Sequence, residues 1–245
     1  GFQAFSLGVA FGGKLSKFIG NSDVSEKEVE DAFKEENDKK AKITEDGVEF
    51  RSIIDGSKHF FSPEKSMQIQ RDLGADIIFA FDECTSPHAS KQYLKESMDR
   101  THRWAERSLE EFKKNNLSSQ SLFGIVQGGR HEDLRKESAK VIGSMNFDGF
   151  GIGGSFIKED MSNAVRWVNE ILPEEKPRHL LGVGEPIDMI LGVENGCDTF
   201  DCVAATRMAR NGTLYTKKGK INILNSKFRN DFRAIEDDCN CYACR

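Results

Sequence analysis

Five short apolar segments alternate with four helical patterns between residues 75 and 203 of this 245-residue chain. The apolar segments span 75–85, 121–129, 147–154, 178–186 and 198–203, and the helical patterns span 87–115, 132–144, 159–171 and 186–195. The segment 75–85 is almost continuously apolar, as in strands that are buried on both faces of a sheet. Strands and helices in this order, joined by long connections, predict a parallel sheet in an α/β fold.

The residues that end these apolar segments distinguish between two parallel architectures. Each segment ends in a carboxylate, an amide or glycines, namely Asp82, 127–129, 153–154, 182–184 and Asp201. In a (β/α)8 TIM barrel, reactive groups gather at the carboxyl ends of successive strands. Five consecutive ends of this kind favour a partial TIM barrel.

A doubly wound sheet is the competing architecture. Its best support is the spacing of Gly149, Gly151 and Gly154, which matches a GxGxxG dinucleotide motif. No acidic residue ends a following strand at the usual distance, and the glycines fall largely within the apolar segment. The barrel is therefore the expected fold.

The region before the alternating part has two different characters. Residues 21–46 are densely charged and contain a capping box from Ser25 to Glu28, which predicts a short surface helix in an inserted excursion. Residues 47–69 predict a hairpin that turns at 55–56. A helix opened by Ser62 and Pro63 is expected to follow the hairpin.

Composition limits the class of protein. A hydrophobic content of 38% allows a substantial core. The sequence has neither an apolar run long enough for a membrane span nor a secretory signal, so a cytoplasmic protein is expected. The net charge of −5 argues against indiscriminate nucleic-acid binding. Between residues 207 and 233, however, there are eight basic side chains and one acidic side chain. This excess of positive charge fits either a local surface that binds a polyanion or a solvated basic surface without a partner.

The six cysteines do not form the spacing of a secreted disulfide framework. Three of them, Cys239, Cys241 and Cys244, have a C-x-C-x-x-C spacing that suits one tetrahedral Zn²⁺ and leaves a fourth ligand position to fill. Three thiolates favour a structural zinc rather than one that activates water. A chance trio without metal is the alternative.

Three of the strand-end residues could together read a guanine-like base. Asp82 can accept two hydrogen bonds, Gln127 can donate and accept, and the N–H of Gly154 can reach a carbonyl oxygen. Phe2 and Leu181 could sandwich a planar ring. Each residue also has a structural explanation: a helix cap for Asp82, a loop brace for Gln127, and core packing for Phe2 and Leu181.

Asp201 is the candidate nucleophile. With a purine bound, its carboxylate could attack an anomeric sugar carbon, as in retaining glycosidases. Arg207 and Arg210 follow it and could grip phosphate, while a capped or salt-bridged aspartate is the structural alternative. Glu83 is a poor second acid, because neighbours along a strand point to opposite faces.

Several motifs resemble one family in order and spacing. They are FDECT from residue 81, FGIVQGG from 123, GIGG from 151, LLGVGEP from 180, TFDCV from 199, TRMARNG from 206 and the CxCxxC cluster. Together they resemble the queuine tRNA-ribosyltransferase (tRNA-guanine transglycosylase) family in its bacterial form. The resemblance implies a TIM barrel with a zinc-binding subdomain that exchanges guanine at the tRNA wobble position for a 7-deazaguanine. It also implies homodimers and a role in queuosine biosynthesis.

The resemblance also implies a role for individual residues. The matching residues are Asp201 as nucleophile, Asp82, Gln127 and Gly154 on the base, Phe2 and Leu181 stacked on the base, Cys84 beside a small preQ1 base, and Arg207 and Arg210 near the RNA.

Departures from the family pattern concern both ends of the chain and the base pocket. The family's general acid/base aspartate would lie upstream of Gly1, and the fourth zinc ligand would lie beyond Arg245. The sequence therefore reads as a fragment, expected to be inactive alone, with a partial barrel over 1–205 and a tRNA-contacting, zinc-binding segment over 206–245. Cys84 in the DECT stretch resembles enzymes that accept preQ1 and favours that base, whereas GGSF at 153–156 replaces the usual GGLA and leaves preQ0 and queuine open.

Three other functions share parts of this sequence pattern. An archaeosine-type transglycosylase shares the chemistry but adds an RNA-binding domain. A non-catalytic RNA-binding subunit is disfavoured because Asp82 and Asp201 are both present. A metal-dependent hydrolase is disfavoured because the five histidines are scattered along the chain.

Overall fold

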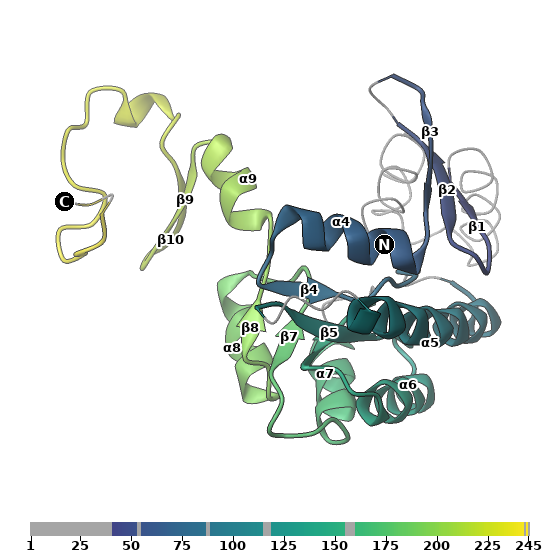
Figure 1. Cartoon of the computed structure of the whole chain (residues 1–245). Coiled ribbons are helices and arrows are strands. Elements are labelled where there is room, and N and C mark those ends of the chain that lie inside the picture. Colours follow the sequence, from purple (N-terminus) through teal and green to yellow (C-terminus); the bar gives the residue numbers. More distant parts are fainter. Residues whose placement is uncertain are drawn as a thin grey trace.

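The computed structural model describes residues 41–52, 55–86, 89–114, 119–154, 160–242 and 244. Within these residues the chain forms a curved half-barrel, a small antiparallel sheet beside it, and an arm that extends away from it (Figure 1). The helix expected near 25–28, the side chain of Phe2, and residues 155 and 156 lie outside the described residues.

The half-barrel is a parallel sheet whose strands follow chain order in space. The strands are β4 (Ile77–Phe79), β5 (Ser121–Val126), β6 (Gly149–Ile152), β7 (Arg178–Leu180) and β8 (Thr199–Phe200). Each pairs in parallel with the next, in the order β4-β5-β6-β7-β8. A doubly wound sheet reverses direction at a switch point, whereas a barrel keeps the chain order. This order confirms the predicted partial barrel.

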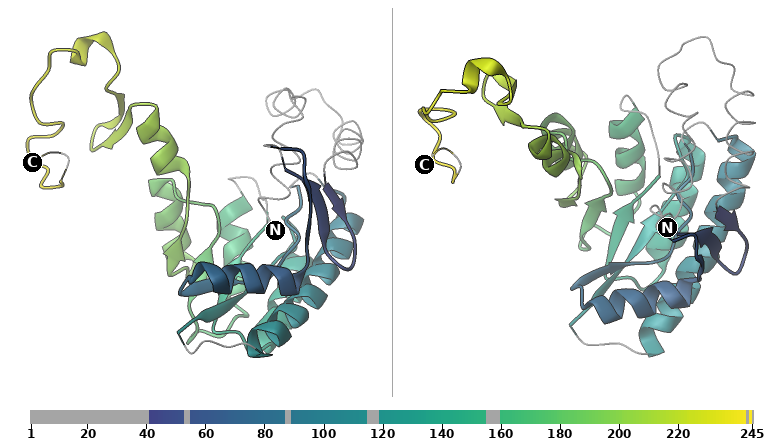
Figure 2. Two further views of the ribbon diagram at one scale, coloured as in Figure 1. Left: turned by 45° about the horizontal axis from the view of Figure 1, so that its top comes forward. Right: turned by 90° about the horizontal axis from the view of Figure 1, so that it is seen from above.

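Helices cover the outer face of this sheet, as Figure 2 shows. They are α5 (Lys91–Lys114), α6 (Glu132–Ser144), α7 (Met161–Asn169) and α8 (Pro186–Glu194), and α4 (Pro63–Leu73) lies against α5 and β4. The buried core lies between sheet and helices and includes Ile78, Leu122, Phe150, Ile152 and Leu180. These residues alternate with inward-facing ones, as the period of a strand requires.

The inner face of β6 carries glycines, and neighbouring rings use the space that they leave. A Cβ at Gly149 would lie 2.5 Å from the ring of Phe123, and a Cβ at Gly151 would lie 3.1 Å from Phe79. The rings of Phe79 and Phe123 meet edge to face, with centroids 5.6 Å apart. The glycines of the GxGxxG spacing therefore make room inside the barrel sheet.

The predicted hairpin is present and belongs to a three-stranded sheet. β2 (Val48–Arg51) pairs antiparallel with β3 (Lys58–Phe61), and β1 (Ala41–Ile43) pairs with β2 within the charged region. The Ser62 side chain then accepts the N–H of Lys65 at 3.2 Å and caps α4 as expected. This sheet packs on α5 through Trp104, whose indole N–H donates to the Glu45 carbonyl at 2.7 Å.

The arm follows β8 directly. It consists of α9 (Ala204–Arg210), the hairpin of β9 (Thr213–Thr216) and β10 (Gly219–Asn222), a 3-10 turn (Ser226–Phe228) and the cysteine segment. Glu185 joins the arm to the half-barrel, because it accepts hydrogen bonds from Tyr215 at 2.9 Å and from Lys220 at 3.2 Å. Over the described residues, none of the helices has the length and apolar character needed to cross a membrane.

Candidate active site

Asp82 and Gln127 form a buried pair at the carboxyl ends of β4 and β5. The Gln127 Nε2 donates to Asp82 Oδ2 at 2.7 Å, and both residues are buried. Burial raises the pKa of the Asp82 carboxyl, and the hydrogen bond from Gln127 only partly opposes this effect. Gln127 Oε1 is also buried and accepts no hydrogen bond from the described residues. The pair thus offers acceptor atoms that a ligand could satisfy.

The backbone of Gln127 is fixed from behind the sheet. Its N–H donates to Ser138 Oγ on α6 at 3.1 Å, and Ser138 Oγ lies 3.0 Å from His102 Nε2 on α5. Burial lowers the pKa of His102, which favours its neutral form. Two helices of the core therefore hold the residue that contacts Asp82.

Arg135 organises the glycine turns beside this pair, a role that no motif in the sequence indicates. It is fully buried, and it donates from Nε to the Gly129 carbonyl at 2.6 Å and from Nη1 to the Gly153 carbonyl at 2.6 Å. Burial lowers its pKa to about 10. Gly154 has a φ of 95°, and a Cβ there would lie 3.0 Å from Gln127 Oε1. Gly154 therefore lies directly against the amide of the buried pair.

Asp201 follows β8, at the other edge of the same sheet. Its Oδ1 accepts the N–H of Gly182 at 2.8 Å and lies 3.0 Å from His179 Nε2. The Asp201 side chain is 59% exposed, so the carboxylate is open to solvent at the carboxyl end of the strands. His179 was counted in the sequence as one of five scattered histidines, and only the pairing of β7 with β8 brings it beside Asp201.

The remaining predicted pocket residues have different surroundings. Leu181 lies over the inner face of β6, since a Cβ at Gly151 would be 3.2 Å from its Cδ1. Cys84 is buried close to Asp82 in the chain. Glu83 points away from the pocket, where it accepts Tyr93 Oη–H at 2.6 Å and pairs with Arg100. These contacts fit the expectation that Glu83 is a poor second acid, which stays a prediction.

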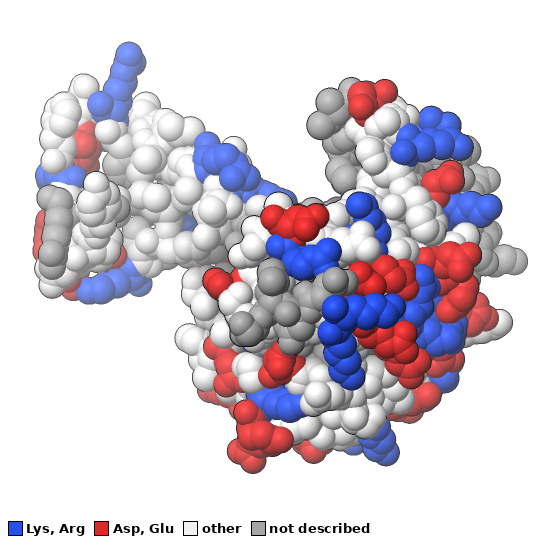
Figure 3. Space-filling model, in the orientation of Figure 1, with Lys and Arg blue, Asp and Glu red and all other residues white. Residues whose placement is uncertain are grey.

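The predicted RNA-contacting residues lie on the arm. Arg207 and Arg210 are exposed on α9, just after Asp201 in the chain. The view in Figure 3 shows acidic and basic side chains interspersed on the half-barrel and blue side chains along the arm. The exposed arginines are available to a phosphate backbone that passes the strand ends.

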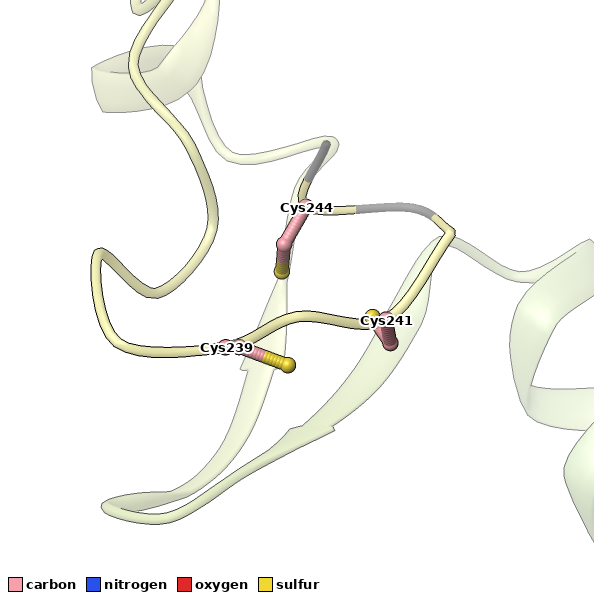
Figure 4. Close-up of side chains that lie close together, drawn as sticks. All are labelled: Cys239, Cys241 and Cys244. Atoms are coloured by element: carbon pink, nitrogen blue, oxygen red, sulfur yellow. The ribbon is translucent and has the colours of Figure 1, made fainter.

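The three cysteines of the arm come together in space. The Sγ atoms of Cys239, Cys241 and Cys244 lie within 4.8 Å of one another (Figure 4). Zn–S bonds of about 2.3 Å in a tetrahedron place sulfur atoms about 3.8 Å apart, so a small closure of this loop would fit the ion. A hydrogen bond from the Cys244 N–H to the Cys241 carbonyl, at 3.1 Å, holds the loop in this turn. The cluster can hold a metal ion.

A family model described as queuine tRNA-ribosyltransferase matches residues 11–245. The chain belongs to this family. Among curated proteins, the queuine tRNA-ribosyltransferase of Thermoanaerobacter pseudethanolicus is 52% identical over 207 residues, which cover 83% of this chain and 55% of that protein. The one from Bacillus subtilis is 49% identical over 206 residues, covering 83% and 54%. The one from Fusobacterium nucleatum is 48% identical over 209 residues, covering 83% and 56%.

The chain spans about half the length of these queuine tRNA-ribosyltransferases. The family predicted from the motifs is thus confirmed, and so is the α/β half-barrel with a cysteine cluster near its end. The roles assigned to individual residues stay predictions.

Proposed function

We propose that the full-length protein is a tRNA-guanine transglycosylase that exchanges the wobble guanine of tRNAs with GUN anticodons for a 7-deazaguanine. The observation that carries the proposal is that the strand ends present two different kinds of polar group, one buried and one exposed. A buried acceptor pair, Asp82 and Gln127, ends β4 and β5, and an exposed carboxylate, Asp201, ends β8. Base recognition needs the first arrangement, and attack on a sugar needs the second.

The base would be held by the buried pair and the adjacent turn. The Asp82 carboxylate accepts N1–H and the exocyclic amino group of the purine, and the N–H of Gly154 donates to O6. Gln127 donates to one acceptor of the base and accepts with its unsatisfied Oε1. A ring without these hydrogen-bonding groups would leave the Asp82 and Gln127 acceptor atoms buried without partners. The site therefore strongly prefers a guanine-like ring.

Asp201 would carry the covalent step. One carboxylate oxygen bonds to C1′ of the ribose as the C1′–N9 bond breaks, and the departing guanine takes a proton from the acid/base aspartate expected upstream of this chain. N9 of the incoming 7-deazaguanine then attacks C1′, loses its proton to the same acid/base group, and releases the carboxylate. Charge and atoms balance over the two halves of the exchange.

The arm would bind the tRNA. Arg207 and Arg210 lie where they can meet phosphates near the anticodon loop, and the basic stretch that follows extends the contact. A zinc ion held by the three cysteines, with a fourth ligand outside this chain, would rigidify the arm. We propose that residues 1–205 form the barrel part and residues 206–245 the tRNA-contacting part. We also propose that the protein is a homodimer in the cytoplasm.

PreQ1 is the base we favour, because Cys84 lies in the pocket segment as in enzymes that accept this small base. The direct test is an exchange assay with labelled guanine and a GUN-anticodon tRNA, followed by competition with preQ1, preQ0 and queuine. We expect guanine exchange and the strongest competition from preQ1. Asp201→Asn should abolish exchange, whereas Asp72→Asn, at an exposed carboxylate on α4, should not.

Two results would change the proposal. Preference for preQ0 with modification in the D-arm would indicate an archaeosine-type enzyme. Binding of tRNA with no exchange by the full-length wild-type protein would indicate a non-catalytic RNA-binding subunit.

A further inference from the structure

His179 contacts the carboxylate of Asp201 across the β7–β8 pair. Its Nε2 lies 3.0 Å from Asp201 Oδ1, and its Nδ1 lies 2.8 Å from Thr199 Oγ1. His179 and Thr199 are opposite each other in the register of the two strands. The imidazole therefore contacts both Thr199, which lies within β8, and Asp201, which follows β8.

The partners of the ring determine which nitrogen carries the proton. An ionised carboxylate only accepts hydrogen bonds, so Nε2 of His179 must be the donor to Asp201. The hydroxyl of Thr199 can donate, so Nδ1 of the neutral ring can accept from it. A hydrogen bond on one ring nitrogen is the usual way in which a protein fixes the role of the other.

The ring has little freedom to leave this position. The His179 side chain is only 14% exposed, and its ring centroid lies 5.3 Å from that of Phe79 on β4. Gly151 of β6 pairs with His179 and adds no side chain beside it. Of the three described side chains in contact with the imidazole, Phe79, Thr199 and Asp201, only Asp201 is ionisable.

The contacts of Asp201 are uneven between its two oxygens. Oδ1 receives both the His179 ring and the Gly182 N–H, whereas no hydrogen bond reaches Oδ2 from the described residues. Two donors on one oxygen fix the plane of the carboxylate and leave the lone pairs of the other oxygen available for attack.

We propose that His179 is a positioning residue, which holds Oδ1 of Asp201 so that Oδ2 faces the anomeric carbon. This inference rests on the proposed function, because it assumes that Asp201 is the nucleophile.

The test uses the full-length protein with GUN-anticodon tRNA and labelled guanine. His179→Phe keeps a ring against Phe79 but removes the donor, and we expect kcat to fall roughly 10- to 100-fold with KM for tRNA nearly unchanged. His179→Gln places an amide N–H near the position of Nε2 without a titratable group. We expect it to recover most of kcat, because the amide N–H can replace the Nε2–H donor to Asp201.

Two controls separate positioning from folding. His59→Phe alters a histidine on the distant hairpin that bonds Ser57, and it should leave kcat unchanged. Nitrogen-15 NMR of the imidazole in the wild-type protein should show the proton on Nε2, and in Asp201→Leu this preference should be lost. The NMR readout does not depend on activity.

The outcomes are distinguishable. If the wild-type protein exchanges guanine and Asp201→Asn does not, but His179→Phe matches the wild type in kcat, the positioning role is wrong while the proposed function stands. If His179→Phe raises only KM, the residue binds tRNA and the inference also fails. If the wild-type protein does not exchange guanine, both proposals fall together.

Discussion

Gln127 donates a 2.7 Å hydrogen bond to Asp82, and this bond joins the ends of two neighbouring strands below the mouth of the half-barrel. The bond satisfies one carboxylate oxygen and orients the amide, while Gln127 Oε1 stays buried without a partner in the described part of the chain. A buried, incompletely satisfied polar pair costs stability and is typical of sites that bind a ligand.

Asp82→Asn should stabilise the protein while it removes base binding. Burial raises the pKa of Asp82, so the folded protein retains a proton that the unfolded chain releases at lower pH. Stability therefore falls as the pH rises from the unfolded pKa through the folded one, and the cost is fully present above both values. Denaturant unfolding should show Asp82→Asn more stable than the wild type near neutral pH, by on the order of 1 kcal/mol. The gain should shrink toward pH 4, and a gain independent of pH would contradict the explanation.

Arg135→Met should be strongly destabilising. The substitution keeps the bulk of the side chain but leaves the carbonyls of Gly129 and Gly153 without their buried donors. We expect a loss of roughly 3 kcal/mol or more in the free energy of unfolding, measured by urea denaturation. Lys136→Met, at the next and only partly buried position of α6, removes an ion pair with Glu132 and should change stability by less than about 0.5 kcal/mol. Equal effects of the two variants would argue against the role of Arg135.

Gly149→Ala tests the packing inside the half-barrel. The new Cβ would lie 2.5 Å from the Phe123 ring, so the ring must move and disturb its contact with Phe79. Overpacking of this kind costs about 1–3 kcal/mol. The matched variant is Gly143→Ala on α6, whose Cβ would lie 3.3 Å from the flexible end of the Leu172 side chain. Alanine is favoured over glycine within a helix. Thermal melting should separate the two, and a neutral Gly149→Ala would contradict the described inner face.

The alternation of strands and helices predicted the order of the elements but not their lengths. Residues 198–203 were expected as a strand, yet β8 contains only Thr199–Phe200. Pairing with β7 ends at Phe200, so Asp201 and the residues after it lie outside the ladder. β1 was missed because its three residues lie in a densely charged region, where charge hides the weak alternation of a strand.

The site could be predicted only where residue type and strand position coincide. Asp82, Gln127 and Asp201 each end a strand, so the barrel hypothesis alone places them on one rim. Arg135 and His179 could not be found in this way, because their roles depend on partners far along the chain. Pairing of β7 with β8 is needed to bring His179 to Asp201, and packing of α6 under the sheet is needed to bury Arg135.

The cysteine cluster predicts a metal-dependent arm. The protein in its full natural length should contain close to one equivalent of zinc per chain, by elemental analysis after dialysis. Cys241→Ser should lose it, because one of three clustered thiolates is replaced by a poor zinc ligand. Cys202→Ser changes a cysteine outside the cluster and should keep the metal. Folded protein with no bound zinc, or zinc retained in Cys241→Ser but lost in Cys202→Ser, would contradict the assignment.

The central claim is that Asp201 forms a bond to the ribose of the wobble nucleotide. The most direct measurement is denaturing electrophoresis and intact-mass analysis of the full-length protein incubated with GUN-anticodon tRNA under conditions that trap the intermediate. We expect a covalent complex with the combined mass of protein and tRNA lacking one guanine, present in the wild type and absent in Asp201→Asn. A covalent complex that persists in Asp201→Asn, without conversion of the asparagine back to aspartate, would contradict the account.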